Sequence, residues 1–431
     1  MAFRKTSRAA SAAVLLLCVL GAAAAQAEPV TGKPYRLELL PREDSTRTDP
    51  ETGAALLFLT NGKEKDGNLY FHQRSWLADG SVILFSSQRE KGGLMGYVAA
   101  TGELVRITAS DGAPVNRPTA AVNRNSVFAM SGDRCLEIAL SVEVKTRRGV
   151  PRAVVTAVER QLCVLPGVDV YLNESCDARY LAAGGAAMAD GKPGIMLVDE
   201  ADGSTRLACA LPEGLAYGGH VQWSTTNPNW ISFAGRPERL WMVDIREGKP
   251  FCPYVQRPGE LVTHESWWVN DQLMFCGGVH AAPHEDSHVK LLDPRTGVVR
   301  IIGEGAWWPG ATPEELAKRN WWHASGSPDG CWAAGDNWHG DIMLFEGPAA
   351  RPRLLTTGHR TYGRGAHPEV GWDRRGEQVI FNSHMLGEPA VCVATIPETW
   401  RNEVRAMGGR VETPPPVPEG QTPKGDRGLM E

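Results

Sequence analysis

The stretch Asp79-Gly80-Ser81-Val82-Ile83-Leu84-Phe85 decides how the fold is interpreted. A polar turn is followed at once by β-branched and aromatic residues, which is the signature of a strand entered from a tight turn. The same arrangement recurs before the apolar runs 230–233, 273–275, 332–334 and 379–381, and more weakly at 123–129 and 177–183. The repeat predicts a chain built from one β-rich unit used many times.

A second recurring piece strengthens this interpretation. A strand-like run ends in aspartate and a glycine follows four residues later, in the pairs Asp199 and Gly203, Asp244 and Gly248, and Asp293 and Gly297. This spacing is typical of a hairpin with a short turn. The turns of the first piece fall near 79, 123, 177, 227, 271, 329 and 375, so seven units lie 44 to 58 residues apart. That is the size of a propeller blade, and we predict an all-β, seven-bladed β-propeller.

The two ends of the chain are expected to lie outside the propeller, which should span 28–411. Arg4, Lys5 and Arg8 precede an apolar run at 12–25, and Ala25-Gln26-Ala27 offers a cleavage site, so 1–27 is interpreted as a secretory signal peptide. The alternative, a membrane anchor, is disfavoured because the run is short. The Pro- and Gly-rich tail at 412–431 is expected to be disordered. A signal peptide implies a periplasmic or secreted protein.

Composition excludes several classes of function. Removing 1–27 takes away three of the 45 basic residues and none of the 50 acidic ones, which leaves 42 against 50 and a net charge of −8. Such an acidic protein is a poor general binder of nucleic acid. None of the eight cysteines after Cys18 lies in a Cys-x-x-Cys pair, which disfavours a zinc ribbon. No further apolar stretch is long enough to span a membrane.

The longest gap between units lies between 271 and 329. Within it, Thr312 can cap a helix, Pro313 suits the first helical position, and Glu315 completes a capping box. We therefore expect a short helix at 312–318, inserted between two blades.

The histidines recur in phase with the repeat. Six or seven residues before the first turn residue of their own unit lie His72, His220, His264 and His323. In the last unit His367 and Glu369 take comparable positions, two apart and therefore on one face of a strand. Because equivalent positions in successive blades form a ring, we expect a site at one end of the propeller axis. The alternative is that these polar side chains only hydrate a central channel.

The residue types in this ring point to a particular chemistry. A cluster of histidine and glutamate suits a divalent metal ion, and a histidine outside the metal shell can act as a base because its pKa lies near neutrality. Arginines accompany the ring at 74, 236, 239, 360 and 364. Next to the ring they would bind carboxylates, and elsewhere they would be ordinary surface charge. The 14 tryptophans either stack on sugar rings or fill the blades.

The pieces that carry a family resemblance span nearly the whole chain after 27. They are Phe71-His72-Gln73-Arg74 through Asp79-Gly80, Gly219-His220, Thr263-His264-Glu265, 323–336, and His367-Pro368 through 391–398. In order and spacing they resemble the oligogalacturonate lyases. Members of that family are seven-bladed propellers that cleave short pectin fragments by β-elimination, with a manganese-type divalent ion and a histidine base. The resemblance implies a lyase whose substrate is an acidic oligosaccharide, with Ca²⁺ and Zn²⁺ as alternatives to Mn²⁺.

The resemblance also implies roles for individual residues. His220 matches the base, and His264 and His367 match metal ligands. The family's third histidine ligand falls at Glu369, which can bind a metal. We add His323, which lies in phase with them, as a fourth candidate ligand.

The sequence departs from the family at two positions. The family's glutamine ligand falls at Arg364, which cannot bind a metal. Its catalytic arginine matches Gly194, so that role is empty or taken by Arg160 or Arg236. We expect the substrate to be held by Gln73, Arg74, Arg236 and Arg364.

Two other functions remain open from the sequence. One is a lyase for a different uronate polysaccharide, and the other is a non-catalytic exported propeller that binds glycans or proteins. The turn repeat is shared by such propellers, whereas the phase of the histidines favours a site. A propeller-fronted serine peptidase is disfavoured because the chain has no Gly-x-Ser-x-Gly sequence.

Overall fold

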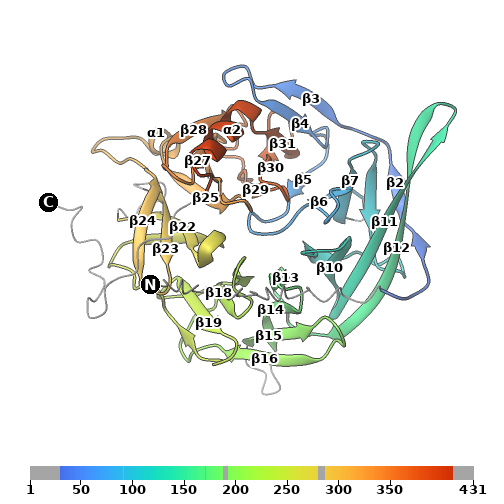
Figure 1. Ribbon diagram of the computed structural model, residues 1–431, viewed down its shortest axis with the longest axis horizontal. Coiled ribbons are helices and arrows are strands. Elements are labelled where there is room, and N and C mark those ends of the chain that lie inside the picture. The colour runs from blue at the N-terminus through green and yellow to red at the C-terminus, as the bar shows by residue number, and fades with distance from the viewer. Residues whose placement is uncertain (1–29, 91, 170, 188–192, 280–286, 411–431) are drawn as a thin grey trace, which may run out of the picture.

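A computed structural model describes residues 30–410, apart from 91, 170, 188–192 and 280–286. The predicted signal peptide, 1–27, and the predicted tail, 412–431, lie outside the described residues. The described part of the chain forms seven antiparallel sheets that follow one another around a central axis, as Figure 1 shows. The all-β, seven-bladed propeller predicted from the turn repeat is confirmed.

Blades 1 to 3 come from the first half of the chain. Blade 1 contains β5 (Asp66–Asn68), β6 (Val82–Ser87), β7 (Gly93–Val98) and β8 (Leu104–Ile107), with β2 (Glu38–Leu40) outside β8. Blade 2 contains β9 (Asn116–Ala120), β10 (Ser126–Ser131), β11 (Arg134–Arg147) and β12 (Val150–Val164), with β1 (Tyr35–Arg36) outside β12. Blade 3 contains β13 (Asn173–Glu174), β14 (Tyr180–Ala187), β15 (Pro193–Asp199) and β16 (Thr205–Ala210).

Blades 4 to 6 each have four strands. Blade 4 contains β17 (Gln222–Trp223), β18 (Trp230–Ala234), β19 (Leu240–Asp244) and β20 (Pro250–Phe251). Blade 5 contains β21 (Leu261–Trp267), β22 (Leu273–Gly278), β23 (His288–Asp293) and β24 (Val298–Gly303). Blade 6 contains β25 (Trp321–Gly326), β26 (Trp332–Asn337), β27 (Ile342–Glu346) and β28 (Pro352–Thr356).

Blade 7 closes the ring by combining strands from both ends of the described chain. Its inner strands are β29 (Gly371–Trp372), β30 (Gln378–Ser383) and β31 (Ala390–Thr395), and its outer strands are β4 (Ala55–Phe58) and β3 (Ser45–Thr48). Cys392 of β31 lies opposite Phe58 of β4 in the antiparallel register. Backbone hydrogen bonds between the first and last parts of the chain therefore hold the ring shut.

The apolar core lies between neighbouring blades. In five blades the repeated apolar run places a phenylalanine on the second strand, and these rings are completely buried: Phe85, Phe128, Phe233, Phe275 and Phe381. Burial of one such side chain stabilises the fold by about 1.5–3 kcal/mol. The apolar run that follows each turn therefore recurs in the sequence because each blade packs against its neighbours through it.

The second repeated piece forms the expected hairpin. The N–H of Gly203 donates to the carbonyl of Asp199 over 2.8 Å, and the N–H of Gly248 donates to that of Asp244 over 2.9 Å. Gly203 has a φ of 74°, a left-handed conformation that glycine adopts without a steric penalty. The same turn therefore joins the third and fourth strands of blades 3 and 4.

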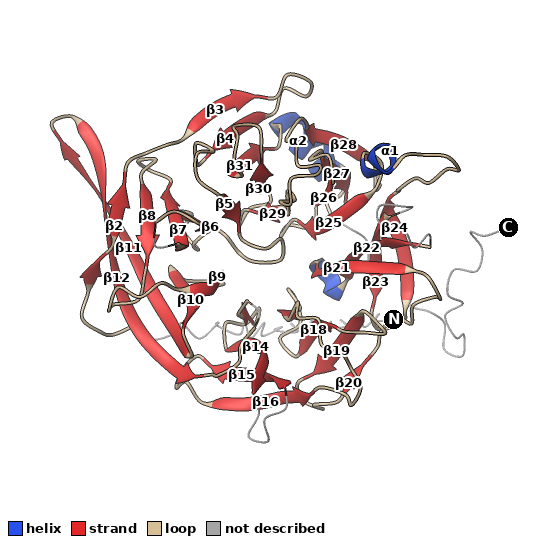
Figure 2. Ribbon diagram, turned by 180° about the vertical axis from the view of Figure 1, so that it is seen from behind, coloured by secondary structure: helices blue, strands red, loops and turns tan. Residues whose placement is uncertain are grey.

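The helical segments of the described chain are short. Figure 2 shows two of them, α1 and α2, at the outer side of the ring. The predicted helix is α1 (Pro313–Ala317), and Thr312 and Glu315 form the capping box as expected. α2 (Glu398–Ala406) follows the last strand, and a 3₁₀ turn, η1 (Val269–Asp271), lies between β21 and β22. Within the described residues, no helix has the length and apolar character needed to cross a membrane.

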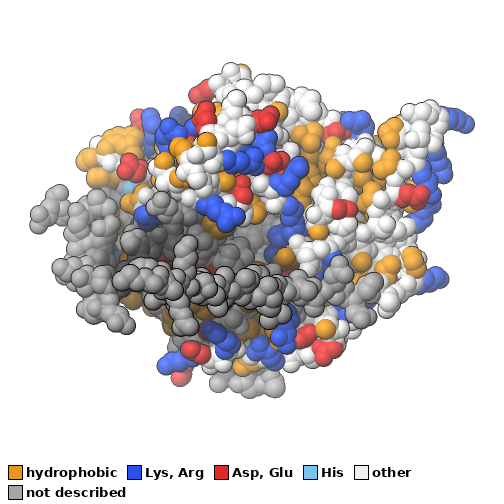
Figure 3. Space-filling view, viewed as in Figure 1, with side chains coloured by type: hydrophobic (Ala, Val, Ile, Leu, Met, Phe, Trp, Pro, Cys, Tyr) orange, Lys and Arg blue, Asp and Glu red, His pale blue; other side chains and the backbone are white. Residues whose placement is uncertain are grey.

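The hairpin β11–β12 extends beyond the body of blade 2. Its strands have 14 and 15 residues, whereas the neighbouring β10 has six. Figure 3 shows basic side chains along its outer end, where Lys145, Arg147, Arg148 and Arg152 are exposed. The hairpin lies on the outer side of the ring, away from the axis, as Figure 1 shows.

Candidate functional site

The five histidines predicted to share a phase come together in the structure. Ring centroids are separated by 5.8 Å between His72 and His220, and by 6.0 Å between His220 and His264. The chain of rings continues with 4.2 Å from His264 to His323 and 5.5 Å from His323 to His367. His264 and His323 lie on β21 and β25, the innermost strands of blades 5 and 6. The loops that lead into β17 and β29 supply His220 and His367, and the loop after β5 supplies His72. The phase argument therefore located a real cluster.

Irregular backbone aims several of these side chains. His220, His264 and Glu369 have φ values of 57°, 51° and 55°, a left-handed conformation that is uncommon for residues other than glycine. The pairing of β21 with β22 shifts register between Thr263 and Ser266, so His264 lies in a β-bulge. Bulges are frequent beside functional sites because they redirect a side chain.

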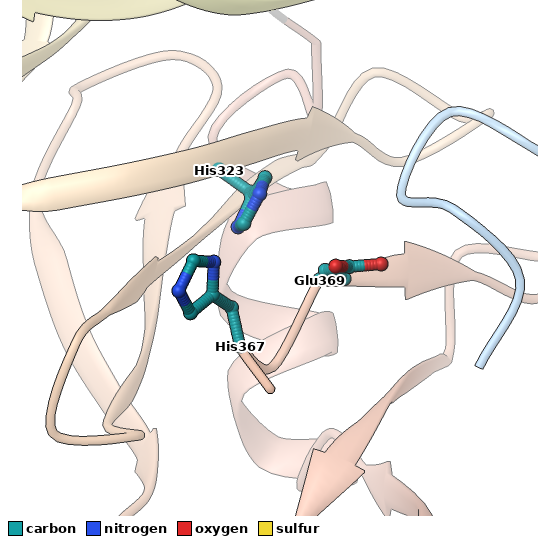
Figure 4. Close-up of side chains that lie close together, drawn as sticks. All are labelled: His323, His367 and Glu369. Carbon is teal, nitrogen blue, oxygen red and sulfur yellow. The ribbon is translucent and has the colours of Figure 1, made fainter. Parts of the chain in front are cut away.

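Three of the predicted metal ligands form a compact set. One ligand atom each from His323, His367 and Glu369 lies within 4.8 Å of the other two, and Figure 4 shows these side chains close together. Two imidazoles and a carboxylate are a donor set that divalent metal ions accept. The residues present therefore fit a divalent ion.

Asp336 supports this set from behind and was not found from the sequence. It is fully buried on β26, and its carboxylate lies 3.0 Å from Nδ1 of His323. The same carboxylate accepts a hydrogen bond of 2.7 Å from the backbone N–H of Glu369. A carboxylate on one ring nitrogen fixes the histidine orientation and leaves the other nitrogen for a metal.

The electrostatics of the set favour a cation. Burial, together with the charge of Asp336, raises the pKa of Glu369 to about 7, against the opposing effect of His323. Burial lowers the pKa of His323, but the charge of Asp336 and its hydrogen bond outweigh burial, so the net pKa is raised. The site thus disfavours uncompensated negative charge, which a bound cation would relieve.

His264 lies beside the set rather than within it. Its ring packs against His323 and, with centroids 4.9 Å apart, against the edge of Trp322. Nδ1 of His264 lies 3.0 Å from the hydroxyl oxygen of Thr263. Burial, followed by the charges of His323 and His220, holds its pKa well below the ordinary value, so the imidazole is neutral. Its role as a ligand remains a prediction.

His220, the predicted base, is surrounded by three polar side chains. Its Nε2 lies 3.2 Å from the hydroxyl oxygen of Tyr70, and its Nδ1 lies 3.4 Å from a carboxylate oxygen of Glu265. Arg239 places Nη2 at 3.2 Å from Nε2 and donates from Nε to Glu265 over 2.9 Å. Burial, then the charges of Arg239 and His323, lowers the pKa of His220 well below its ordinary value. The pKa near neutrality that was expected for this base is therefore not found: the imidazole is neutral, as a general base requires, but the lowered pKa makes it a weaker base.

The arginine beside His220 is Arg239, not Arg236 as predicted for the substrate site. Arg236 is exposed, whereas Arg239 immediately precedes β19 of blade 4, the blade whose first strand follows His220. Both arginines were visible beside the ring in the sequence, but side-chain direction at the end of a hairpin could not be assigned. Glu265 follows His264 directly and is completely buried.

The other predicted substrate residues lie in different surroundings. Gln73 is buried, with Nε2 at 3.0 Å from Nδ1 of His72. Arg74 donates to Glu174 over 2.9 Å and, together with His72 and Gln73, lines a cavity of about 490 Å³. Arg364 is exposed on the loop before His367. Substrate contacts by these residues remain predictions.

The role of the catalytic arginine expected at Gly194 is not taken by Arg160. Arg160 lies on β12, where its guanidinium donates to Glu137 over 2.6 Å and to the carbonyl of Glu200 over 2.7 Å. Through these contacts Arg160 links blade 2 to blade 3. The arginine that does reach the predicted base is Arg239.

The architecture defines the class of protein as a seven-bladed β-propeller with a polar site at one end of its axis. No protein-family profile matches the sequence, and a search of characterised protein sequences finds no significant match. Solved structures do match. One is an oligogalacturonate lyase in complex with manganese, with a TM-score of 0.63 and 18% identity, over 86% of this chain and 100% of that one. Another is oligogalacturonate lyase from Vibrio parahaemolyticus, with a TM-score of 0.61 and 16% identity, over 86% of this chain and 99% of that one. These matches establish a shared fold.

Proposed function

We propose that the protein is an exported, metal-dependent lyase that cleaves uronate-containing oligosaccharides by β-elimination. The observation that carries the proposal is the pairing of two groups at one end of the axis. His323, His367 and Glu369 offer a donor set for a divalent cation, and His220 lies beside it as a neutral imidazole whose Nδ1 is 3.4 Å from Glu265. The two lyases of the same fold support the reaction class.

The chemistry of a uronate explains why both groups are needed. The proton on C5 is only weakly acidic, and its removal places negative charge on the adjoining C6 carboxylate. A divalent ion bound by the cluster would neutralise that charge as it develops. His220 would remove the C5 proton, and burial together with the charge of Arg239 keeps the imidazole in its neutral form.

The proposal does not require an external nucleophile. The electrons of the C5–H bond form the C4–C5 double bond, and the oxygen on C4 departs. This agrees with a site that contains imidazoles, carboxylates and a guanidinium. The sugar is proposed as a short acidic oligosaccharide because the two structures of the same fold are oligogalacturonate lyases.

The test is an ultraviolet assay for the unsaturated product. Galacturonate, glucuronate and mannuronate–guluronate oligosaccharides are incubated with the mature protein, with chelator and after addition of Mn²⁺, Ca²⁺ or Zn²⁺. We expect one class to give product only with a divalent ion. No product from any class with any ion would refute the proposal.

Variants separate the two groups. His220→Ala should lower turnover by at least about a hundredfold, the typical contribution of a positioned base, while metal content stays unchanged. His367→Ala should lose metal and turnover together. The control is His339→Ala, which removes a histidine outside the cluster and should leave both unchanged.

A further inference from the structure

Tyr70 contacts the predicted base, although it lies outside the histidine phase. It follows β5 in blade 1, and its hydroxyl oxygen is 3.2 Å from Nε2 of His220 in blade 4. The ring of Tyr171 stacks on Tyr70, with centroids 6.3 Å apart and planes 4° from parallel, which orients the phenol. A cavity of about 190 Å³ is lined by both Tyr70 and His220, together with the glycines at 218 and 219. The phenol and the imidazole therefore share one small space that a ligand can enter.

β-Elimination needs a proton donor as well as a base. When the bond between C4 and its oxygen breaks, the departing sugar leaves as a strongly basic alkoxide unless it is protonated in the same step. A positioned acid contributes typically about 10²–10⁴-fold to such a step. The site must therefore contain a group that can give a proton close to the place where the base takes one.

The other groups around His220 are poor candidates for that donor. Arg239 stays protonated throughout, and Glu265 is completely buried and bound by Arg239. His72 is neutral because burial, then the charge of His220, lowers its pKa to about 3. A phenol is protonated at neutral pH, so Tyr70 has a proton to give in the resting site.

We infer that Tyr70 donates the proton to the departing sugar oxygen and that His220 then restores it, an inference that rests on the proposed function. His220 takes the proton from C5, and Tyr70 gives its own proton to the oxygen leaving C4. The imidazolium then returns its proton to the phenolate across the Tyr70–His220 contact. One C–H and one C–O bond break, one C=C and one O–H bond form, and both side chains end as they began.

The inference is tested with two substrates that differ only in their leaving group. One is the uronate oligosaccharide found in the product assay, and the other carries a 4-nitrophenyl group on the C4 oxygen, whose phenolate leaves without protonation. Tyr70→Phe should slow the first substrate at least about a hundredfold and the second by less than about fivefold. His220→Ala should slow both, because each substrate still needs the base.

The control is Tyr180→Phe, which removes a phenol hydroxyl from blade 3 and should leave both rates unchanged. Equal losses on both substrates in Tyr70→Phe would overturn the inference and indicate a positioning role. Unchanged rates would overturn it as well.

A second measurement does not need turnover. In ¹⁵N-histidine NMR spectra, Tyr70→Phe should shift the Nε2 resonance that His220→Ala removes, and an unshifted resonance would show that the contact is absent. If the wild-type protein cleaves no uronate, the proposed function fails instead, and the NMR result still decides the contact.

Discussion

Replacement of Arg124 by methionine should destabilise the joint between blades 2 and 3. Arg124 donates to Glu137 of β11 over 2.7 Å and to Glu200, after β15, over 2.6 Å. It also reaches Glu174 of β13 at 3.4 Å. The arginine side chain is 17% exposed and the three carboxylate side chains are at most 4% exposed, so solvent screens these pairs weakly. Methionine keeps much of the length and removes the charge.

The expected loss follows from what each carboxylate retains. Glu137 keeps Arg160, and Glu174 keeps Arg74. Glu200 has no other cation within ion-pair distance among the described residues. Breaking a buried ion pair costs about 3–5 kcal/mol when one charge is left behind, so we expect a loss of about 3 kcal/mol in the free energy of unfolding.

The loss should grow with pH. Burial, then the charge of Glu174, raises the pKa of Glu200 from 4.5 to about 8, and Arg124 opposes this shift. Without Arg124 the pKa of Glu200 rises further. A carboxyl with a raised folded-state pKa binds more protons folded than unfolded, so its contribution to stability falls as pH rises from its unfolded pKa through its folded pKa. Arg124→Met should therefore be milder at pH 6 than at pH 9.

The assay is urea unfolding at both pH values for wild type, Arg124→Met and the double variant with Glu200→Gln. The double variant should recover part of the loss at pH 9, because no carboxylate is left to ionise at position 200. Arg134→Met is the control, since Arg134 pairs with the half-exposed Asp111 and should cost less than about 1 kcal/mol. A loss under about 1 kcal/mol at pH 9, or one independent of pH, would refute the reasoning.

Three further substitutions test other parts of the structure. Glu265→Gln should lower turnover about 10–100-fold, because the buried carboxylate 3.4 Å from Nδ1 of His220 no longer stabilises the imidazolium that forms when the base takes its proton, and rates at saturating substrate measure this loss. Asp336→Asn should weaken divalent metal binding about 10–100-fold in a calorimetric titration, since the carboxylate orients His323; unchanged affinity would contradict that role. Leu56→Ala on the strand that closes the ring should cost about 2–5 kcal/mol in urea unfolding, and a loss below about 1 kcal/mol would show that closure is not limiting.

The fold was accessible from the sequence because one local signal was repeated. Each turn places its apolar run on the second strand of a blade, and the same packing demand recurs around the ring. Blade 7 was counted from the turn at 375, but its closure by β3 and β4 was not predicted. Pairing between strands more than 300 residues apart leaves no local pattern in the chain.

The site could be predicted only in part, because only its histidines follow the repeat. Phase located the histidines, because equivalent positions of equivalent blades must meet at the axis. Phase could not locate Asp336 on the second strand of blade 6 or Tyr70 in the loop after β5. It placed Arg239 beside the ring but could not single it out from the neighbouring arginines. Their contacts depend on side-chain direction and on blades that meet only after the ring has closed.

Backbone conformation gives evidence for the site that does not depend on residue type. A non-glycine residue in the left-handed region costs roughly 1–2 kcal/mol, and such strain persists where the surrounding structure imposes it. His220, His264 and Glu369 share this conformation at comparable points of three blades, and each belongs to the cluster. Arg117, six residues before the turn at 123, has a φ of 52° at the comparable point of blade 2, and its charge lowers the pKa of Tyr171, which burial otherwise raises. The strained positions therefore continue the ring into a blade that has no histidine, where an arginine takes the comparable point.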